Sequence, residues 1–144
     1  MTPRFEEEIG LIKKVIVDFG GGHRSNLAII SDPFYGESEL MDRVEGMTGE
    51  EGIRIDARSL IRDFEALENV SGRIVIVEEV HRLYHRKIGG FETMNRFLKM
   101  LASSEKLFIT TWNSYSWKYL DEVLGLGGHF PQQIRLSKMS AGEI

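Results

Sequence analysis

The chain has no cysteine among its 144 residues, so disulfide bonds and thiolate zinc sites are excluded. It also has no apolar run of the roughly 18–20 residues that a membrane-spanning helix requires. Residues 1–8 are acidic on balance and lack the apolar stretch of a signal peptide. The formal net charge of −4 argues against a protein wrapped in nucleic acid, although it does not exclude a local basic patch. We therefore expect a cytoplasmic protein with no membrane segment.

What is present is typical of a globular domain. Hydrophobic residues make up 42% of the chain and charged residues 28%, which is ordinary for a folded protein. A chain of 144 residues is long enough for one domain with a hydrophobic core. No internal repeat or low-complexity segment is visible. Instead, helical and strand patterns alternate along the chain.

Five short apolar segments predict strands. The clearest is residues 74–77, a continuous run of isoleucine and valine. Such a run without alternation is typical of a strand that is covered on both faces, as in a parallel sheet. The other predicted strands are residues 27–30, 53–55, 107–111 and 133–136. Strands separated by helices form right-handed βαβ units, so the sequence predicts a three-layer α/β fold with a mainly parallel five-stranded sheet and helices on both faces.

Apolar residues at helical spacing predict the helices between these strands. Asp56 is a predicted N-cap for one of them. We expect inward-facing side chains at Leu60, Ile61, Phe64 and Leu67 in that helix, and at Trp117, Leu120, Val123 and Leu124 in the last one. The predicted helices are residues 4–18, about 37–47, 57–67, 91–101 and 114–124.

Polar residues follow three of the predicted strands. Residues 31–38 follow the first strand, Glu78 and Glu79 end and follow the third, and residues 110–113 end and follow the fourth. Ligands of parallel sheets bind beyond the carboxyl ends of the strands, so these residues are the candidates for a site.

This arrangement resembles the AAA-type and related archaeal P-loop ATPases. In those proteins a phosphate-binding loop comes first, then a hydrophobic strand that ends in two acids, then a strand that ends in a polar sensor. The resemblance extends from about Leu11 to Leu136. It rests on the order and spacing of the motifs, because each motif alone is weak.

The phosphate-binding loop departs from the family pattern. That pattern, the Walker A motif G-x-x-x-x-G-K-[ST], surrounds phosphate with backbone N–H groups, reaches the β- and γ-phosphates with its lysine and holds Mg²⁺ with its hydroxyl. Gly36 and Ser38 match it, but Ser31 replaces the first glycine, Glu37 replaces the lysine and Pro33 removes one N–H. The sequence therefore indicates a degenerate Walker A motif.

The same loop is rich in negative charge. Asp32, Glu37 and Glu39 would place three carboxylates where a triphosphate would lie. Two unit charges about 4 Å apart interact by about 4 kcal/mol at an effective dielectric constant near 20. Replacing lysine by glutamate loses one such attraction and adds one repulsion. Even a few kcal/mol corresponds to a loss on the order of a hundredfold in affinity.

The resemblance assigns roles to the remaining site residues. It implies that Glu78 and Ser38 would hold Mg²⁺, that Glu79 would polarise the attacking water, and that Asn113 or Thr111 is the sensor. Gly36, Glu37, Ser38 and Thr111 would be the remnant of the phosphate site. The residues alone also allow structural roles, in which the two glutamates pair with neighbouring arginine or lysine and Asn113 caps the next helix.

Other side chains allow further interpretations. Residues 81–87 form a basic segment that could contact a nucleic-acid backbone or an acidic partner, or could be a solvated loop. His81 and His85 have the spacing of a helical metal pair, but no third ligand is evident, so we do not expect a zinc site. Trp112 and Tyr115 could stack on a base or serve in packing. Phe34 and Tyr35 could fill the space of a nucleotide.

The sequence thus predicts a degenerate AAA/P-loop ATPase-like domain that is not a competent ATPase alone and acts through a protein partner or homologous subunits. We expect no bound cofactor. One alternative is a weak NTPase, an ATP hydrolase using ATP and Mg²⁺, completed by a neighbouring subunit or a C-terminal lid. Another is a nucleic-acid-binding module that uses residues 81–87.

We expect one domain at residues 2–138. The capping-box spacing of Ser140 and Glu143 predicts that residues 139–144 begin a C-terminal region.

Overall fold

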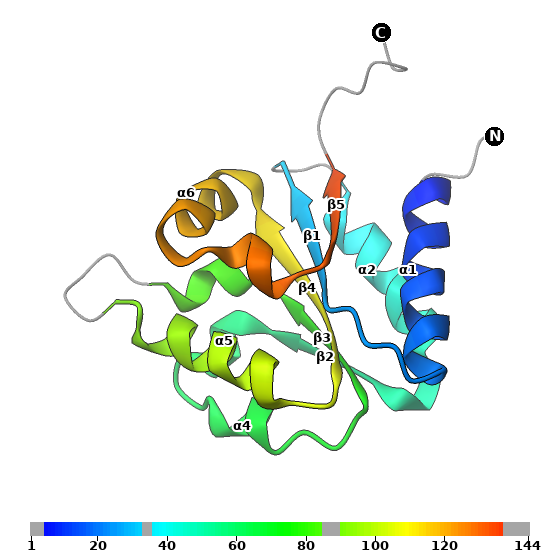
Figure 1. Cartoon of the computed structure of the whole chain (residues 1–144), viewed down its shortest axis with the longest axis horizontal. Helices are drawn as coiled ribbons and strands as arrows, with labels where there is room; N and C mark the ends of the chain where they lie inside the picture. Colours follow the sequence, from blue (N-terminus) through cyan, green and yellow to red (C-terminus); the bar gives the residue numbers. More distant parts are fainter. Residues whose placement is uncertain (1–4, 33–35, 85–89, 137–144) are drawn as a thin grey trace, which may run out of the picture.

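The computed structural model describes residues 5–32, 36–84 and 90–136, and its centre is a five-stranded sheet (Figure 1). All strand pairs are parallel and the strand order is β2-β3-β4-β1-β5. The predicted α/β class with a parallel five-stranded sheet is therefore confirmed. The strands are β1 (Leu27–Ser31), β2 (Gly52–Asp56), β3 (Ile74–Glu78), β4 (Leu107–Asn113) and β5 (Gln132–Leu136).

Helices cover both faces of the sheet and make the molecule three-layered (Figure 1). One face is covered by α1 (Glu6–Gly20) and α2 (Glu37–Thr48). The other is covered by α3 (Ala57–Leu60), α4 (Glu65–Glu68), α5 (Glu92–Ser103) and α6 (Ser114–Leu124). Short 3₁₀ turns are η1 (Gly49–Glu51), η2 (Val80–Leu83) and η3 (Leu126–His129). Within the described ranges, every helix is too short or too polar to span a lipid bilayer.

Two hydrophobic cores lie on opposite faces of the sheet, and successive strand residues contribute to them in turn. Along β1, Leu27 and Ile29 join the core beneath α1 and α2, whereas Ala28 and Ile30 join the core beneath α5 and α6. The run 74–77 divides in the same way, so every position in it is buried. Burial on both faces explains why this strand is apolar without alternation.

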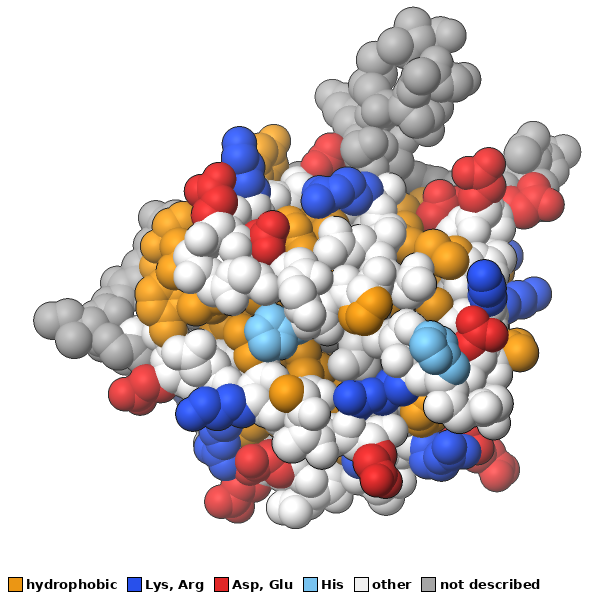
Figure 2. Space-filling model, viewed as in Figure 1, with side chains coloured by type: hydrophobic (Ala, Val, Ile, Leu, Met, Phe, Trp, Pro, Cys, Tyr) orange, Lys and Arg blue, Asp and Glu red, His pale blue; other side chains and the backbone are white. Residues whose placement is uncertain are grey.

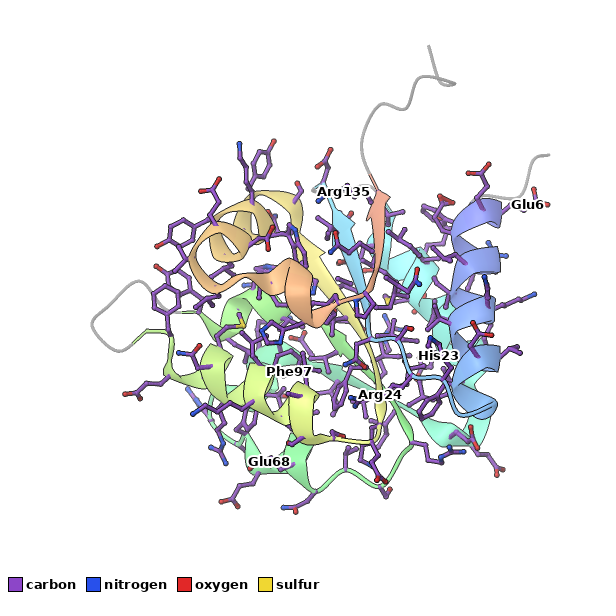
Figure 3. The ribbon with its side chains drawn as sticks, viewed as in Figure 1. Glu6, His23, Arg24, Glu68, Phe97 and Arg135 are labelled. Atoms are coloured by element: carbon purple, nitrogen blue, oxygen red, sulfur yellow. The ribbon has the colours of Figure 1, made fainter. Side chains whose placement is uncertain are left out.

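Two side chains labelled in Figure 3 tie the outer layers to the sheet. Phe97 of α5 is fully buried and meets the ring of Phe108 in β4 edge to face, with centroids 6.2 Å apart. Arg24, just before β1, donates hydrogen bonds to the carbonyl oxygens of Ser104 and Lys106. Phe97 thus packs α5 on β4, and Arg24 links the chain before β1 to the segment that leads into β4; these are two of the strands whose ends form the site described below.

The structure corrects three predictions about helices. The single helix expected at residues 57–67 is broken into α3 and α4 by a turn at residues 61–64. Ile61, predicted to face inward, lies in that turn and is 41% exposed. Val123 was also expected to face inward but is 49% exposed. The covered face of α6 is centred on Trp117 and Leu120, and Val123 lies outside it.

Candidate functional site

A hollow of about 620 Å³ opens where β1, β3 and β4 end. Ser31 and Asn113 lie side by side at its base because they are register partners at the ends of β1 and β4. Of the site residues predicted from the sequence, Glu78 and Thr111 lie outside the lining but interact with Glu37, which is part of it. The lining residues are Ser31, Asp32, Gly36, Glu37, Ser38, Glu79, His81, Arg82, Trp112 and Asn113.

Glu37 is the first residue of α2 and occupies the lysine position of the loop pattern. Its carboxyl group interacts with the side chain of Thr111, which favours the charged form, and lies within electrostatic range of Glu78 and Glu79. The pKa of Glu37 is raised to about 7, chiefly by burial and also by the charges of Glu79 and Glu78, against the opposing effects of Thr111 and Arg54. The position that would carry a positive charge in the family pattern therefore holds a carboxyl group that is partly protonated at neutral pH.

Thr111 connects three elements of the site. It is fully buried in β4, and its hydroxyl accepts a hydrogen bond from the backbone N–H of Glu79 at 2.8 Å. The same hydroxyl is the partner of Glu37. Glu79 itself has a φ of 56°, in the left-handed region that non-glycine residues rarely adopt. The hydroxyl that the family resemblance assigns to phosphate or water thus holds the strained turn after β3 and the start of α2.

Glu78 is paired with an arginine from the neighbouring strand. The Nε of Arg54 in β2 donates to Oε1 of Glu78. The Nη1 of Arg54 also contacts Asp42 at 2.6 Å and Glu45 at 3.2 Å, both on α2. The Glu78 and Arg54 side chains are only 18% and 21% exposed. Glu78 therefore has the contacts of a structural residue that pairs with a neighbouring arginine, which is the alternative that the sequence left open. Arg54, which the sequence argument missed, was visible there as a lone charge in an apolar strand.

Glu79 is also paired. Both its carboxylate oxygens accept hydrogen bonds from Arg82, from Nε at 2.9 Å and from Nη2 at 3.3 Å. Arg82 belongs to the basic segment 81–87. The positive charge of Arg82 is therefore paired with the carboxylate of Glu79. Residues 85–87 of that segment, including His85, lie outside the described residues.

His81 and Asn113 meet at the base of the cavity. The Nδ1 of His81 accepts a hydrogen bond from the backbone N–H of Asn113 at 3.1 Å, which places any ring proton on Nε2. Burial lowers the pKa of His81, which favours the neutral ring. The side-chain oxygen of Asn113 accepts from the N–H groups of Tyr115 and Ser116 at 2.9 and 3.3 Å. Asn113 therefore caps α6, the structural role that the sequence allowed for it.

Asp32 links the loop to the same helix. Its Oδ1 accepts a hydrogen bond from the Ser114 hydroxyl at 2.6 Å, and its backbone N–H donates to the carbonyl of Leu136 at 2.9 Å. The negative charge near the start of α6 is favourable for the helix dipole. Phe34 and Tyr35, which were expected to fill the nucleotide space, lie outside the described residues.

Trp112 serves in packing. It is fully buried, and its indole N–H donates to the hydroxyl of Thr110 at 2.8 Å. Its ring packs edge to face against Trp117 and Phe130, at 5.2 and 5.7 Å between centroids. Of the two roles that the sequence left open for Trp112, stacking on a base is excluded by this burial. Tyr115, by contrast, is 75% exposed.

The described residues fit a Mg²⁺-bound nucleotide poorly. A carboxyl group stands in place of the phosphate-binding lysine, and the glutamate expected to face Mg²⁺ is held by Arg54. Among the residues that the structure describes, no group of three or more acidic or histidine side chains is arranged to hold a metal ion. The polar side chains of the site bind one another in an internal network.

No family model and no curated protein matches the sequence. Solved structures with a similar fold include AMPPCP-bound DnaA from Aquifex aeolicus, with a TM-score of 0.67 and 15% identity over 94% of this chain and 48% of that one. They also include the Orc1 protein of Aeropyrum pernix in complex with DNA, with a TM-score of 0.67 and 15% identity over 99% of this chain and 47% of that one. The chain thus spans about half the length of these proteins. At this identity the likeness shows the fold alone, and it confirms the expected AAA/P-loop-like architecture.

Proposed function

We propose that this chain is a degenerate AAA-like domain that does not bind ATP tightly and acts as a protein-interaction or regulatory module. The observation that carries the proposal is the placement of Glu37. Its carboxyl group interacts with Thr111 and with the charges of Glu78 and Glu79 at the end of β3, and it occupies the position from which a lysine would reach phosphate. A polyphosphate at this loop would require Glu37 to be protonated or displaced, and it would still face Glu79.

The surrounding contacts support the same proposal. Arg54 and Arg82 are the cations paired with Glu78 and Glu79, so neither guanidinium is available to phosphate without breaking an ion pair. The sensor-like Asn113 is committed to capping α6. A network of this kind fixes the strand ends and the first turns of α2 and α6 in one arrangement. Such a rigid edge suits recognition of a protein partner or a homologous subunit.

A weak nucleotide-binding domain is the second candidate. One observation favours it: a hollow of about 620 Å³ is present at the strand ends, with Ser38 and Glu79 in its lining. This volume falls within the range of small-molecule sites. Binding there would need Glu37 to leave Thr111. DnaA was solved with the nucleotide analogue AMPPCP, but at 15% identity the likeness supports this role for the present chain only as an alternative.

Nucleic-acid binding through residues 81–87 remains the third candidate. The Orc1 structure contains DNA, which makes the test worthwhile for this chain. The described part of the segment gives it little support, because Arg82 is engaged by Glu79. Titration with short DNA and RNA at low salt decides the matter, since phosphate contacts weaken steeply as salt rises. We expect no salt-dependent binding.

Three versions of the chain test the principal proposal by isothermal titration with Mg·ATP and Mg·ADP. The wild-type chain is expected to give no binding heat at millimolar nucleotide. Glu37→Gln removes the negative charge at nearly constant shape, and Glu37→Lys restores the charge of the family pattern. We expect affinity to rise from wild type to Glu37→Gln to Glu37→Lys. Micromolar binding by the wild type, or a higher affinity of the wild type than of Glu37→Lys with both chains folded, would refute the proposal.

A further inference from the structure

The outward face of α6 carries a row of apolar side chains. Tyr115, Tyr119 and Val123 are 75%, 48% and 49% exposed. Residues four apart lie above one another on a helix, so the three form one continuous stripe. In the described ranges the other exposed large hydrophobic side chains are Val17 and Ile61, which lie on α1 and after α3. The concentration of exposed apolar surface on α6 therefore sets this helix apart.

An aromatic hollow borders the stripe and enlarges the surface. It measures about 390 Å³ and is lined by Tyr84, Tyr115, Ser116, Tyr119 and Leu120. The rings of Tyr84 and Tyr119 are 5.7 Å apart, and Tyr84 also contacts Phe91 at 4.8 Å between centroids. Figure 2 shows hydrophobic side chains gathered on this side of the molecule, at the left of the view. Tyrosine is one of the residues that are enriched at protein–protein interfaces.

The charges beside the stripe indicate which partner fits it. Lys118 and Glu122 are both exposed and lie one turn apart on the same flank of the stripe. If two copies of α6 pack antiparallel about a twofold axis at Tyr119, Tyr115 of one copy lies opposite Val123 of the other. On the flank, Lys118 of each copy then lies within a helical turn of Glu122 of the other. The axis also brings the two Lys118 side chains near each other, but the two Lys118–Glu122 attractions outnumber this one repulsion, so the surface is complementary to itself in charge.

We propose that α6 is a self-association surface through which two copies of this chain pair, with their α6 helices antiparallel and the tyrosine hollow at the edge of the contact. Tyr119 lies at the centre, where it meets its own counterpart. Contacts made by one helix and its margin fall below the roughly 1,200 Å² of a stable complex. The dimer is therefore weak and forms at high protein concentration. This face is separate from the Glu37 site, so the proposal stands independently of the proposed function.

Sedimentation velocity of the full chain, from low to high micromolar concentration, tests this proposal. The sedimentation coefficient of the wild type is expected to rise with concentration toward that of a dimer. Tyr119→Lys places two like charges at the twofold axis and should leave only monomer. Val17→Lys, a change at the most exposed apolar side chain of α1, is the matched control and should behave as wild type. A wild type that stays monomeric throughout the range would overturn the proposal.

Charge exchange distinguishes the antiparallel pair from nonspecific adhesion. Lys118→Glu and Glu122→Lys should each raise the dissociation constant, on the order of tenfold, because each replaces two attractions by two repulsions. The double variant Lys118→Glu/Glu122→Lys restores the pairing and should return to wild-type behaviour. These side chains are exposed, and circular dichroism checks that each variant is folded. A double variant no better than the single ones would refute the arrangement.

Discussion

The Thr111 hydroxyl accepts the backbone N–H of Glu79 at 2.8 Å, and the same side chain interacts with the carboxyl group of Glu37. This contact joins the first turn of α2 to the centre of the sheet. Glu37 is the first residue of α2 and occupies the lysine position of the family pattern, where its carboxyl group is largely buried. The predictions below test this contact and the network around it.

The stability of the protein should depend on the protonation of Glu37. Its pKa is raised from 4.5 to about 7 in the folded chain, chiefly by burial. Between these pH values the unfolded chain loses the proton while the folded chain keeps it, so stability falls as pH rises and levels off above about 7. The shift corresponds to about 3 kcal/mol at most, and on the order of 1–2 kcal/mol after solvent screening.

Urea unfolding at several pH values between 4.5 and 8 measures this effect, with Glu37→Gln as the matched variant. The free energy of unfolding of the wild type should decline relative to that of the variant across the range. Parallel pH profiles for the two proteins would show that Glu37 does not titrate as described.

Removal of Arg54 should destabilise the fold strongly. Arg54→Met leaves the largely buried Glu78 carboxylate without its guanidinium partner, at an expected cost of about 2–4 kcal/mol in the free energy of unfolding. Adding Glu78→Gln removes the unpaired charge and should recover part of the loss. The control is Arg73→Met, because Arg73 and Glu51 form a pair at 3.4 Å with side chains 60% and 56% exposed. That change should cost less than about 1 kcal/mol. Equal costs for the two arginines would contradict this interpretation.

Asn113 should contribute to stability as a helix cap. Asn113→Ala removes the acceptor for the N–H groups of Tyr115 and Ser116 and is expected to cost about 1 kcal/mol. Asn113→Ser supplies another good capping oxygen and should retain most of the stability. Chemical denaturation of the three proteins gives the comparison. Equal free energies of unfolding for the alanine and serine variants would show that the cap does not contribute to stability.

Tryptophan fluorescence should report a packed core. The chain contains two tryptophans, and both Trp112 and Trp117 are buried. Quenching by iodide should be weak in the native protein and should rise on unfolding. Addition of nucleotide or short oligonucleotides should leave the emission unchanged. Strong quenching in the native state would mean that at least one of the two indole rings is accessible, against the burial described above.

Much of the fold could be predicted because its signals are local. The unbroken apolar run at residues 74–77 indicates a strand covered on both faces, and the alternation of strands and helices then implies a parallel sheet. The helix expected at residues 57–67 was less secure. Its apolar spacing is helical throughout, but tertiary packing buries Leu60 and Leu67 from two separate short helices. The periodicity of apolar residues alone does not reveal such a turn.

The candidate site was predictable as a set of residues and less so as a set of contacts. Strand order brings Ser31 beside Asn113, and the loop pattern identifies Glu37. The pairing of Glu78 with Arg54 depends on β2 lying next to β3, and sequence order does not determine which strands are neighbours. The burial of Trp112 likewise depends on Phe130, which is distant in the chain.

Exclusion of nucleotide by Glu37 is tested most directly by following the backbone amide signals of Gly36, Glu37 and Ser38 while Mg·ATP is added to the unmodified chain. We expect these signals to keep their positions up to millimolar nucleotide. Saturable shifts at micromolar nucleotide, confined to these residues and the adjoining ends of β3 and β4, would contradict it.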